Sequence, residues 1–305
     1  MSSRLSLHLK RLLRWNMALA IAGVLAGCSA SDVLNALVPS DGYIRHEAVV
    51  YGTNPRQTLD VYEPKSAVPA GGRTLVVFFY GGSWREGSRA TYKFVGEALT
   101  SKGYVAVIPD YRVYPEAVYP VFVEDTAKAL RWAVDNAARY GGSKDRVVLM
   151  GHSAGAHIAA LLTLDPQFLT AVELPSGTVK GFVGLAGPYS FDPLRTEVAR
   201  AVFSHLPDPN VARPITFVKN SGPPMLLLHG ADDTTVGPQN SANMAKALQD
   251  EGKPVTHIVY PDVAHVGIIA AMATPLRNHA PTLNDTATFI DGLFAASAVA
   301  NNAAQ

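Results

Sequence analysis

Residues 151–155 have the sequence Gly-His-Ser-Ala-Gly, whose types and spacing are those of an activated serine. They follow an apolar run at residues 147–150 and open a helical pattern at Ala154, so they lie on a predicted strand–turn–helix junction. A turn this sharp needs small residues on both sides of the nucleophile. The pattern therefore predicts that the Ser153 hydroxyl projects above a sheet, at the positive end of a helix.

A serine hydroxyl becomes a strong nucleophile beside a base, usually a histidine held by a carboxylate. After a junction of this kind the chain order is serine, acid, histidine. Two acids, Asp232 and Asp233, follow the apolar run at residues 225–228. His265 follows the last predicted strand in a short loop, from which its imidazole can reach Ser153, and His279 is a second candidate. We interpret four other histidines on the predicted strands and helices as packing residues: His152, His157, His229 and His257. Of these, His152 is expected to point into the packing beside the sheet.

The candidate residues are positioned by predicted strands and helices that alternate along residues 43–297. Two short β-rich stretches, residues 46–51 and 58–62, predict an antiparallel pair at one sheet edge. Six continuous apolar runs predict strands buried on both faces: 74–79, 104–108, 146–150, 181–185, 225–228 and 255–260. Helical patterns lie at 92–100, 121–140, 154–164, 238–250 and 282–296. The alternation predicts one α/β domain with a mainly parallel sheet.

Two further segments lie outside this alternation. Residues 187–224 are rich in proline and predict an insertion over the carboxyl edge of the sheet. Residues 298–305 form an Ala- and Asn-rich end, which predicts a disordered tail.

The N-terminus has the pattern of a targeting signal. Residues 1–14 are basic, and residues 17–27 are apolar but too few to span a membrane comfortably. They end in Leu-Ala-Gly-Cys28, which resembles the lipobox of bacterial lipoproteins. The resemblance implies a signal peptide at residues 1–27, a lipid anchor at Cys28 and a tether at residues 28–42. An ordinary signal peptide with a chance cysteine, or an uncut signal anchor, are the alternatives.

In that lipoprotein pattern, Ser29 in place of aspartate favours outer-membrane sorting. The expected location is therefore the bacterial cell envelope, with the protein held on the membrane by its lipid anchor.

Composition excludes several classes of protein. Hydrophobic residues make up 48% and charged residues 17%, which is typical of neither a disordered nor a fibrous chain. The single cysteine excludes an internal disulfide and a cysteine-based zinc cluster. Without residues 1–27 the net charge is about −3, which argues against a nucleic-acid-binding domain.

Several segments together resemble the α/β-hydrolase superfamily. They are Tyr-Gly-Gly-Ser-Trp at 80–84, Pro-Asp-Tyr-Arg at 109–112, residues 151–157 and His-Gly-Ala-Asp-Asp at 229–233. The closest likeness is to the carboxylesterase branch, which includes hormone-sensitive-lipase-like, feruloyl and acetyl-xylan esterases, prenylcysteine methylesterases and kynurenine formamidases. The resemblance implies that Asp233 is the catalytic acid, that Asp232 faces solvent, and that Asp125 is structural.

Residues 78–84 look like the HGGG-type loop of esterases, with Tyr80 in place of the histidine and Ser83 in place of the third glycine. Backbone N–H groups of such a loop stabilise the oxyanion of a tetrahedral intermediate. We therefore expect the N–H groups of Gly82, Ser83 and Ala154 to form the oxyanion hole.

These residues predict a serine hydrolase that cleaves small-molecule carboxylic esters through an acyl-enzyme, with no metal or organic cofactor. An arylformamidase-like amidase is the alternative within enzymes. A non-catalytic lipoprotein that binds an envelope partner is the alternative from another class. The sequence leaves the acyl and alcohol specificity open.

Overall fold

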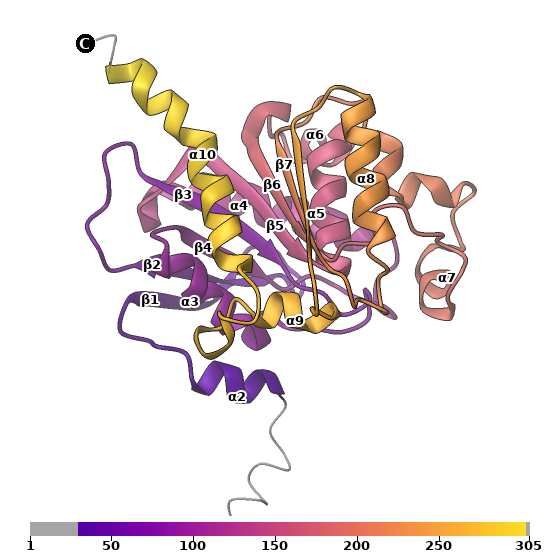
Figure 1. The fold of residues 1–305 in the computed structure, drawn as a ribbon, viewed down its shortest axis with the longest axis horizontal. Helices are drawn as coiled ribbons and strands as arrows, with labels where there is room; N and C mark the ends of the chain where they lie inside the picture. The colour runs from indigo at the N-terminus through magenta and orange to yellow at the C-terminus, as the bar shows by residue number, and fades with distance from the viewer. Residues whose placement is uncertain (1–29, 303–305) are drawn as a thin grey trace, which may run out of the picture.

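The structure, a computed structural model, describes residues 30–302, so the predicted signal peptide and Cys28 lie outside the described residues. Its centre is an eight-stranded sheet with the order β1-β2-β4-β3-β5-β6-β7-β8 (Figure 1). The antiparallel strands are β1 (Tyr43–Val50) and β2 (Thr58–Pro64), at one edge as predicted. The other strands pair in parallel: β3 (Arg73–Phe79), β4 (Val105–Pro109), β5 (Gly142–His152), β6 (Val179–Leu185), β7 (Met225–Gly230) and β8 (Val255–Tyr260).

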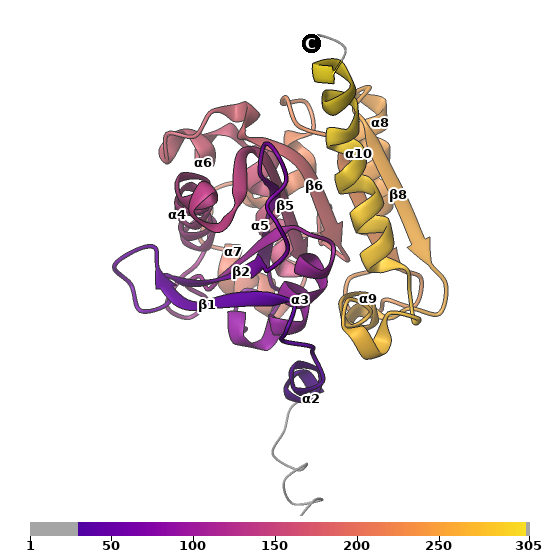
Figure 2. The ribbon, with the colours of Figure 1, turned by 90° about the vertical axis from the view of Figure 1, so that its left-hand side faces the viewer.

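Helices cover both faces of this sheet, which is why its central strands are continuously apolar. Every residue of β3, β4 and β7 is buried. The long helices are α3 (Lys93–Ser101), α4 (Val121–Asn136), α5 (Ala154–Leu164), α8 (Gln239–Asp250) and α10 (Thr282–Asn302). Figure 2 shows α4 and α10 on opposite sides of the sheet. The predicted mainly parallel α/β architecture is confirmed.

Several short helices were not predicted, because one or two turns leave no clear periodicity. They are α2 (Ala30–Ala36), α6 (Pro166–Ala171), α9 (His265–Ala270), η1 (Arg89–Tyr92), η3 (Ser176–Thr178) and η6 (Thr274–Leu276). The helical pattern predicted over 121–140 is α4 followed by the short η2 (Ala137–Tyr140). α2 lies in the segment predicted as a tether, and α10 continues to Asn302, into the segment predicted as a tail.

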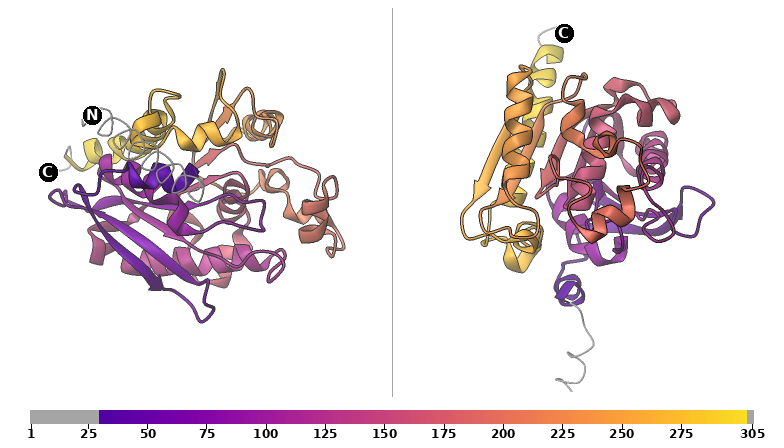
Figure 3. Two further views of the ribbon diagram at one scale, coloured as in Figure 1. Left: turned by 90° about the horizontal axis from the view of Figure 1, so that it is seen from below. Right: turned by 90° about the vertical axis from the view of Figure 1, so that its right-hand side faces the viewer.

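The proline-rich segment 187–224 contains α7 (Glu197–Phe203), η4 (Pro209–Ala212) and η5 (Pro214–Phe217). It is held beside α4 through Tyr119, whose N–H donates to the Val202 carbonyl and whose hydroxyl donates to the Val211 carbonyl. Figure 3 shows this insertion at one side of the molecule, next to the helices that follow the central strands.

The register of the central strands brings the functional segments together. Phe79, at the end of β3, pairs with Gly151 of β5, and Gly151 pairs with Gly184 of β6. The loop after β3 and the turn after β5 therefore start side by side at the carboxyl edge of the sheet. No helix within residues 30–302 combines the length and apolar character that a membrane crossing requires.

Candidate active site

Ser153 occupies the sharp turn between β5 and α5. Its φ of 54° and ψ of −124° form a strained conformation for a residue with a side chain. A Cβ atom on Gly151 would lie 2.4 Å from the Gly155 carbonyl oxygen, and one on Gly155 would lie 2.0 Å from the Phe79 carbonyl oxygen. Only glycine fits at either position, so the two glycines permit the turn that exposes the serine at the end of the strand.

The three predicted triad residues come together at the carboxyl edge of the sheet. The Ser153 Oγ lies 2.9 Å from the Nε2 of His265, and the His265 Nδ1 lies 2.7 Å from the Oδ2 of Asp233. Because a carboxylate only accepts, Nδ1 carries the hydrogen and Nε2 can accept from the serine hydroxyl. The His265 side chain is 13% exposed and the Asp233 side chain is fully buried.

His265 was predicted to lie within a loop, but it is the first residue of α9. The loop before it reaches the triad because β7 ends in Gly230, where a Cβ atom would lie 2.0 Å from the Val263 carbonyl oxygen. The Asp232 N–H donates to that same carbonyl at 3.1 Å. This close approach holds the segment after β8 against the segment after β7, and so brings His265 to Asp233.

Four donors surround the Asp233 carboxylate. Its Oδ1 accepts the N–H groups of Thr235 at 2.9 Å and Val236 at 2.8 Å, and its Oδ2 accepts from His265 and His229. Burial alone would raise the pKa of Asp233, but the hydrogen bonds from both histidines and from the Val236 N–H outweigh it and hold that pKa well below its ordinary value. Asp233 is therefore ionised, which is the form that accepts the Nδ1 hydrogen of His265. The neighbouring Asp232 is exposed.

His229 is a site residue that we did not predict. Its Nε2 lies 2.7 Å from the Val236 carbonyl oxygen and 3.1 Å from the Asp233 Oδ2, and its Nδ1 lies 2.6 Å from the Ser241 hydroxyl. The only sequence signal for His229 is its position four residues before Asp233. This spacing alone does not distinguish a site residue from a packing residue at the end of a strand.

The loop after β3 lies directly against the nucleophile. A Cβ atom on Gly81 would lie 2.9 Å from the Ser153 Cβ. Among the described residues, the N–H groups of Gly82, Ser83 and Ala154 make no backbone hydrogen bond. Gly82 has a φ of 132° and would collide with the Glu86 carbonyl if it carried a Cβ. The loop that contacts Ser153 through Gly81 thus carries N–H groups without a backbone partner.

Tyr80 occupies the position of the histidine in the HGGG-type loop of esterases, and its contacts hold the loop after β3 in place. Its hydroxyl donates to Asp110 Oδ1 at 2.7 Å and accepts from Arg56 at 3.2 Å, and its carbonyl accepts the Tyr111 hydroxyl at 2.6 Å. Its ring stacks between Tyr92 and Tyr111. Burial raises the pKa of Tyr80 well above its ordinary value, so the phenol stays a donor to Asp110.

His152 does not point into the packing beside the sheet, contrary to our prediction. Its ring centroid lies 4.9 Å from that of His265, and its Nε2 donates to the His265 carbonyl at 3.0 Å. Burial, reinforced by the neighbouring His265, lowers the pKa of His152 to about 3. The residue is therefore a neutral side chain that holds the start of α9 beside the serine.

His157 packs in the helix, as predicted, and also joins the loop after β3 to the insertion. The Trp84 indole donates to its Nδ1 at 3.2 Å, and its Nε2 donates to the Ala212 carbonyl at 2.6 Å. Phe191 and Phe203 of the insertion pack on the Trp84 and His157 rings. Trp84 follows Ser83 directly, so this aromatic cluster supports the predicted oxyanion donors.

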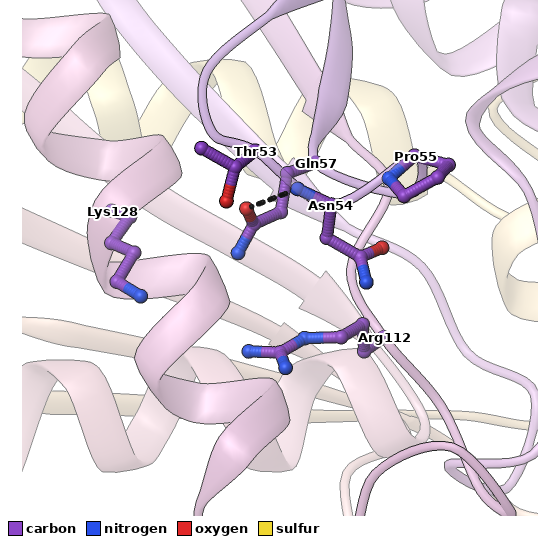
Figure 4. Close-up of a pocket in the computed structure, with 6 residues that line it drawn as sticks. All are labelled: Thr53, Asn54, Pro55, Gln57, Arg112 and Lys128. Carbon is purple, nitrogen blue, oxygen red and sulfur yellow. Dashed lines mark hydrogen bonds between the residues drawn. The ribbon is translucent and has the colours of Figure 1, made fainter.

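A polar cavity of about 420 Å³ lies between the β1–β2 turn and α4 (Figure 4). In this view the side chains of Thr53, Gln57, Arg112 and Lys128 surround it. Arg112 is already paired with the buried Asp125, which supports the structural role expected for that acid. None of the three triad residues lines this cavity. Among the described residues, no cluster of three or more histidine, cysteine or acidic side chains could hold a metal ion.

The chain is similar to several proteins that are named for ester hydrolysis. It is 29% identical over 257 residues to a probable isoprenylcysteine alpha-carbonyl methylesterase of Arabidopsis thaliana, covering 77% of this chain and 53% of the plant protein. It is 30% identical over 244 residues to esterase LipC of Mycobacterium tuberculosis, covering 73% of this chain and 60% of that protein. The chain thus spans between about half and three fifths of the length of these relatives.

Solved esterase structures have the same fold. The propionate-bound thermophilic esterase Est2 of Thermogutta terrifontis is 26% identical, with a TM-score of 0.68 over 83% of this chain and 95% of that one. Esterase B of Lactobacillus rhamnosis is 19% identical, with a TM-score of 0.76 over 99% of each chain.

Together with the sheet order, these likenesses establish an α/β-hydrolase fold. The BD-FAE family profile matches residues 59–248, which make up more than half of the chain, and this protein therefore belongs to the BD-FAE family.

Proposed function

We propose that this protein is a serine carboxylesterase that hydrolyses small-molecule esters through an acyl-enzyme. The observation that carries the proposal is the continuous relay from the Ser153 hydroxyl through His265 to Asp233, with distances of 2.9 and 2.7 Å. The unpartnered N–H groups of Gly82, Ser83 and Ala154 beside the serine support it further. Membership of the BD-FAE family and the esterase names of the relatives favour carboxylic esters as substrates.

Acylation begins when the Nε2 of His265 accepts the proton of the Ser153 hydroxyl, as its oxygen attacks the ester carbonyl carbon. Asp233 accepts the Nδ1 hydrogen of the imidazolium and stabilises its positive charge. The carbonyl oxygen becomes an oxyanion, which receives hydrogen bonds from the three backbone N–H groups. When the tetrahedral intermediate collapses, His265 returns its proton to the departing alkoxide and the alcohol leaves.

Deacylation repeats these steps with water as the nucleophile. His265 takes a proton from a water molecule that attacks the acyl-Ser153 carbonyl, and the same donors stabilise the second oxyanion. His265 then returns the proton to the Ser153 oxygen, which releases the carboxylic acid. Every proton that leaves the serine or the water thus passes through one imidazole nitrogen, Nε2.

The test is the hydrolysis of p-nitrophenyl acetate and butyrate by the wild type and by Ser153→Ala, with the exposed Ser221→Ala as a matched control. Loss of the nucleophile lowers kcat by a factor on the order of 10⁶, whereas the control keeps full activity. A fluorophosphonate probe labels the wild type but not Ser153→Ala. Substantial activity in Ser153→Ala, or faster cleavage of N-formylkynurenine than of either ester, would contradict the proposal.

We also propose that the protein is a lipoprotein of the bacterial cell envelope, anchored by acyl chains on Cys28 after removal of residues 1–27. Support comes from the basic segment at residues 1–14, the short apolar run and the Leu-Ala-Gly-Cys sequence that follows. Two or more acyl chains hold a protein stably on a bilayer. Ser29 in the next position favours the outer membrane.

Metabolic labelling with an alkyne palmitate analogue tests this location. The wild type takes up the label and fractionates with the outer membrane. Cys28→Ala takes up none, and Ser29→Asp is retained in the inner membrane. An unlabelled wild type would contradict the anchor without touching the proposed catalysis.

A further inference from the structure

The N-terminal helix α2 is held firmly next to the loop that carries the predicted oxyanion donors. The Asn35 amide donates to the carbonyls of Ala90 at 2.9 Å and Thr91 at 3.1 Å, and its oxygen accepts the Phe94 N–H at 3.1 Å. Leu34 packs against the core on the same helix. Helix α2 contacts η1, and η1 directly follows the loop of residues 80–88. Helix α2 therefore has a fixed position beside the loop that carries the predicted oxyanion donors.

The segment that begins with His265 lies at the same end of the molecule. The Thr274 hydroxyl and the Arg277 guanidinium both bond the Glu97 carboxylate of α3, at 3.2 and 2.7 Å, and α2 also packs on α3. Figures 1 and 2 show α2 and α9 together at the end opposite the C-terminus, and the β8 arrow in Figure 2 points to this end. The carboxyl edge of the sheet, with the candidate active site, therefore faces the same way as α2.

Large apolar side chains are exposed on these neighbouring elements. Val33 is 40% exposed and Leu37 is 59% exposed in and just after α2, Val266 of α9 is 66% exposed, and Leu276 of η6 is 38% exposed. A single exposed apolar side chain needs no explanation, but a group of them around a functional site marks an interaction surface. Val266 directly follows His265, so this surface includes the edge of the candidate active site.

We propose that this surface, which we call the anchor face and define as α2, α9 and η6 with their flanking residues, rests on a lipid bilayer. The proposal depends on the proposed anchor at Cys28. Ala30 is only two positions after Cys28, with Ser29 between them, and two residues of chain span about 7 Å at most. Because Asn35 fixes α2, so short a connection keeps the anchor face close to the membrane. The apolar side chains then enter the headgroup region, where burial from water favours them.

This orientation indicates a class of substrate. The carboxyl edge of the sheet, where Ser153 lies, faces the same way as the anchor face, so an ester with a long apolar chain would reach the serine by lateral diffusion within the membrane. We therefore infer that membrane-dissolved, amphiphilic esters are the preferred substrates of the proposed esterase.

Fluorescence of a dye on a single introduced cysteine tests the orientation without any need for activity. Cys28 is the sole natural cysteine and is blocked when acylated, so Leu276→Cys and Val68→Cys can each be labelled specifically in the full, lipidated protein. Val68 is a matched control, since it is 54% exposed and its side chain lies beside Gly141, which directly precedes β5 at the opposite, amino edge of the sheet. In phosphatidylethanolamine–phosphatidylglycerol vesicles, nitrobenzoxadiazole at 276 shifts its emission to the blue, whereas the same dye at 68 does not.

Equal, water-like emission from both positions would overturn the proposed orientation. Labelling of Cys28 itself would instead show that the anchor is absent, which separates the two failures.

A kinetic comparison tests the substrate class. Val33→Ser/Leu37→Ser/Leu276→Ser is expected to cleave a vesicle-dissolved p-nitrophenyl palmitate several-fold more slowly than the wild type and soluble p-nitrophenyl acetate at the wild-type rate. Val68→Ser changes neither rate. Unchanged palmitate hydrolysis in the triple variant would contradict the inference, and a wild type inactive on both esters would contradict the proposed esterase itself.

A second inference rests on a different observation, the hydrogen bonds of the fully buried His229. A carbonyl only accepts, so the Nε2 that faces Val236 carries the hydrogen and also reaches the Asp233 Oδ2. The Nδ1 then accepts from the Ser241 hydroxyl, 2.6 Å away on α8. We infer that His229 is a positioning residue, which occupies one side of Oδ2 so that the other side is aimed at the His265 Nδ1.

The pH dependence of kcat/KM distinguishes this role from a merely structural one. His229→Leu removes a donor, which leaves more negative charge on the Asp233 oxygen that faces His265. The midpoint of the acidic limb of the profile should then shift to higher pH by about half a unit, and kcat should fall about tenfold. His229→Gln, whose amide can still donate, should recover most of both. A lower kcat with an unmoved limb, equal in the two variants, would overturn the inference.

Discussion

His157 is a buried imidazole whose two nitrogens have opposite roles. Its Nδ1 must be unprotonated to accept from the Trp84 indole, while its Nε2 donates to Ala212. A second proton on His157 would place an Nδ1–H donor opposite the Trp84 indole N–H donor, away from water. Burial lowers the pKa of His157 to about 4. Because the folded pKa lies below the unfolded value of about 6.5, its contribution to stability is complete above that value and is lost as the pH falls toward 4.

This linkage predicts how a variant changes with pH. His157→Gln keeps one donor and one acceptor but does not titrate. The wild type has the larger free energy of unfolding at pH 7.5, and its advantage over the variant should shrink by about 2 kcal/mol at pH 5. Urea denaturation at the two pH values measures this difference. A gap that stays constant would show that His157 does not become protonated on unfolding.

Gly82 offers a second prediction at the scale of one residue. Its φ of 132° disfavours any side chain, and a Cβ atom would lie 2.2 Å from the Glu86 carbonyl oxygen. Gly82→Ala should therefore displace the adjacent N–H donors and lower kcat by about 100-fold or more with little change in KM. Gly177→Ala is the control, since nothing lies within 4 Å of the added atom. Normal kcat in Gly82→Ala would exclude this loop from oxyanion stabilisation.

Among the elements, the loop after β3 depends on side chains from its neighbours. Asp110, just after β4, accepts the Tyr80 hydroxyl and the Arg89 N–H, and its other oxygen pairs with the Arg89 guanidinium. Arg56, from the β1–β2 turn, donates to the carbonyls of Tyr111 at 2.8 Å and Gly87 at 2.9 Å. Three segments therefore fix one loop, which explains how tyrosine can replace the histidine of the resembling loop.

Removal of a single hydroxyl tests this support. Tyr80→Phe loses a hydrogen bond to the buried Asp110 carboxylate, which is worth about 1.5–3 kcal/mol. We expect a lower melting temperature and a kcat reduced about tenfold, because the loop samples positions where its N–H groups miss the oxyanion. Tyr114→Phe is the control, since the Tyr114 hydroxyl makes no hydrogen bond within residues 30–302. Wild-type kcat together with lower stability would limit Tyr80 to a role in folding.

The strands and long helices could be predicted from the sequence because their signals are local. A continuous apolar run such as residues 74–79 records burial on both faces, and the four-turn helix α4 shows its periodicity clearly. Helix α9 could not be predicted in this way. It has six residues, and its first, His265, is set by contact with Asp233 rather than by a pattern within the segment.

For the molecule as a whole, the sequence predicted the residues that carry their own motif and missed those defined by distant contacts. Ser153 lies in a recognisable pentapeptide, and the resemblance selected Asp233 over Asp232. The bond between Trp84 and His157 joins positions 73 residues apart, and that between His152 and His265 joins positions 113 apart. Neither contact leaves a local pattern, so only the folded sheet reveals them.

The far end of α10 lies across the molecule from α2 and α9 (Figure 1). This separation has a practical consequence for a catalyst fixed to a solid support. Coupling through the C-terminal residues should leave the carboxyl edge of the sheet, where Ser153 lies, facing the solution, whereas coupling near Ala30 should turn that edge toward the bead. Immobilised samples of equal loading, compared by their kcat/KM for a soluble ester, should favour the first attachment several-fold.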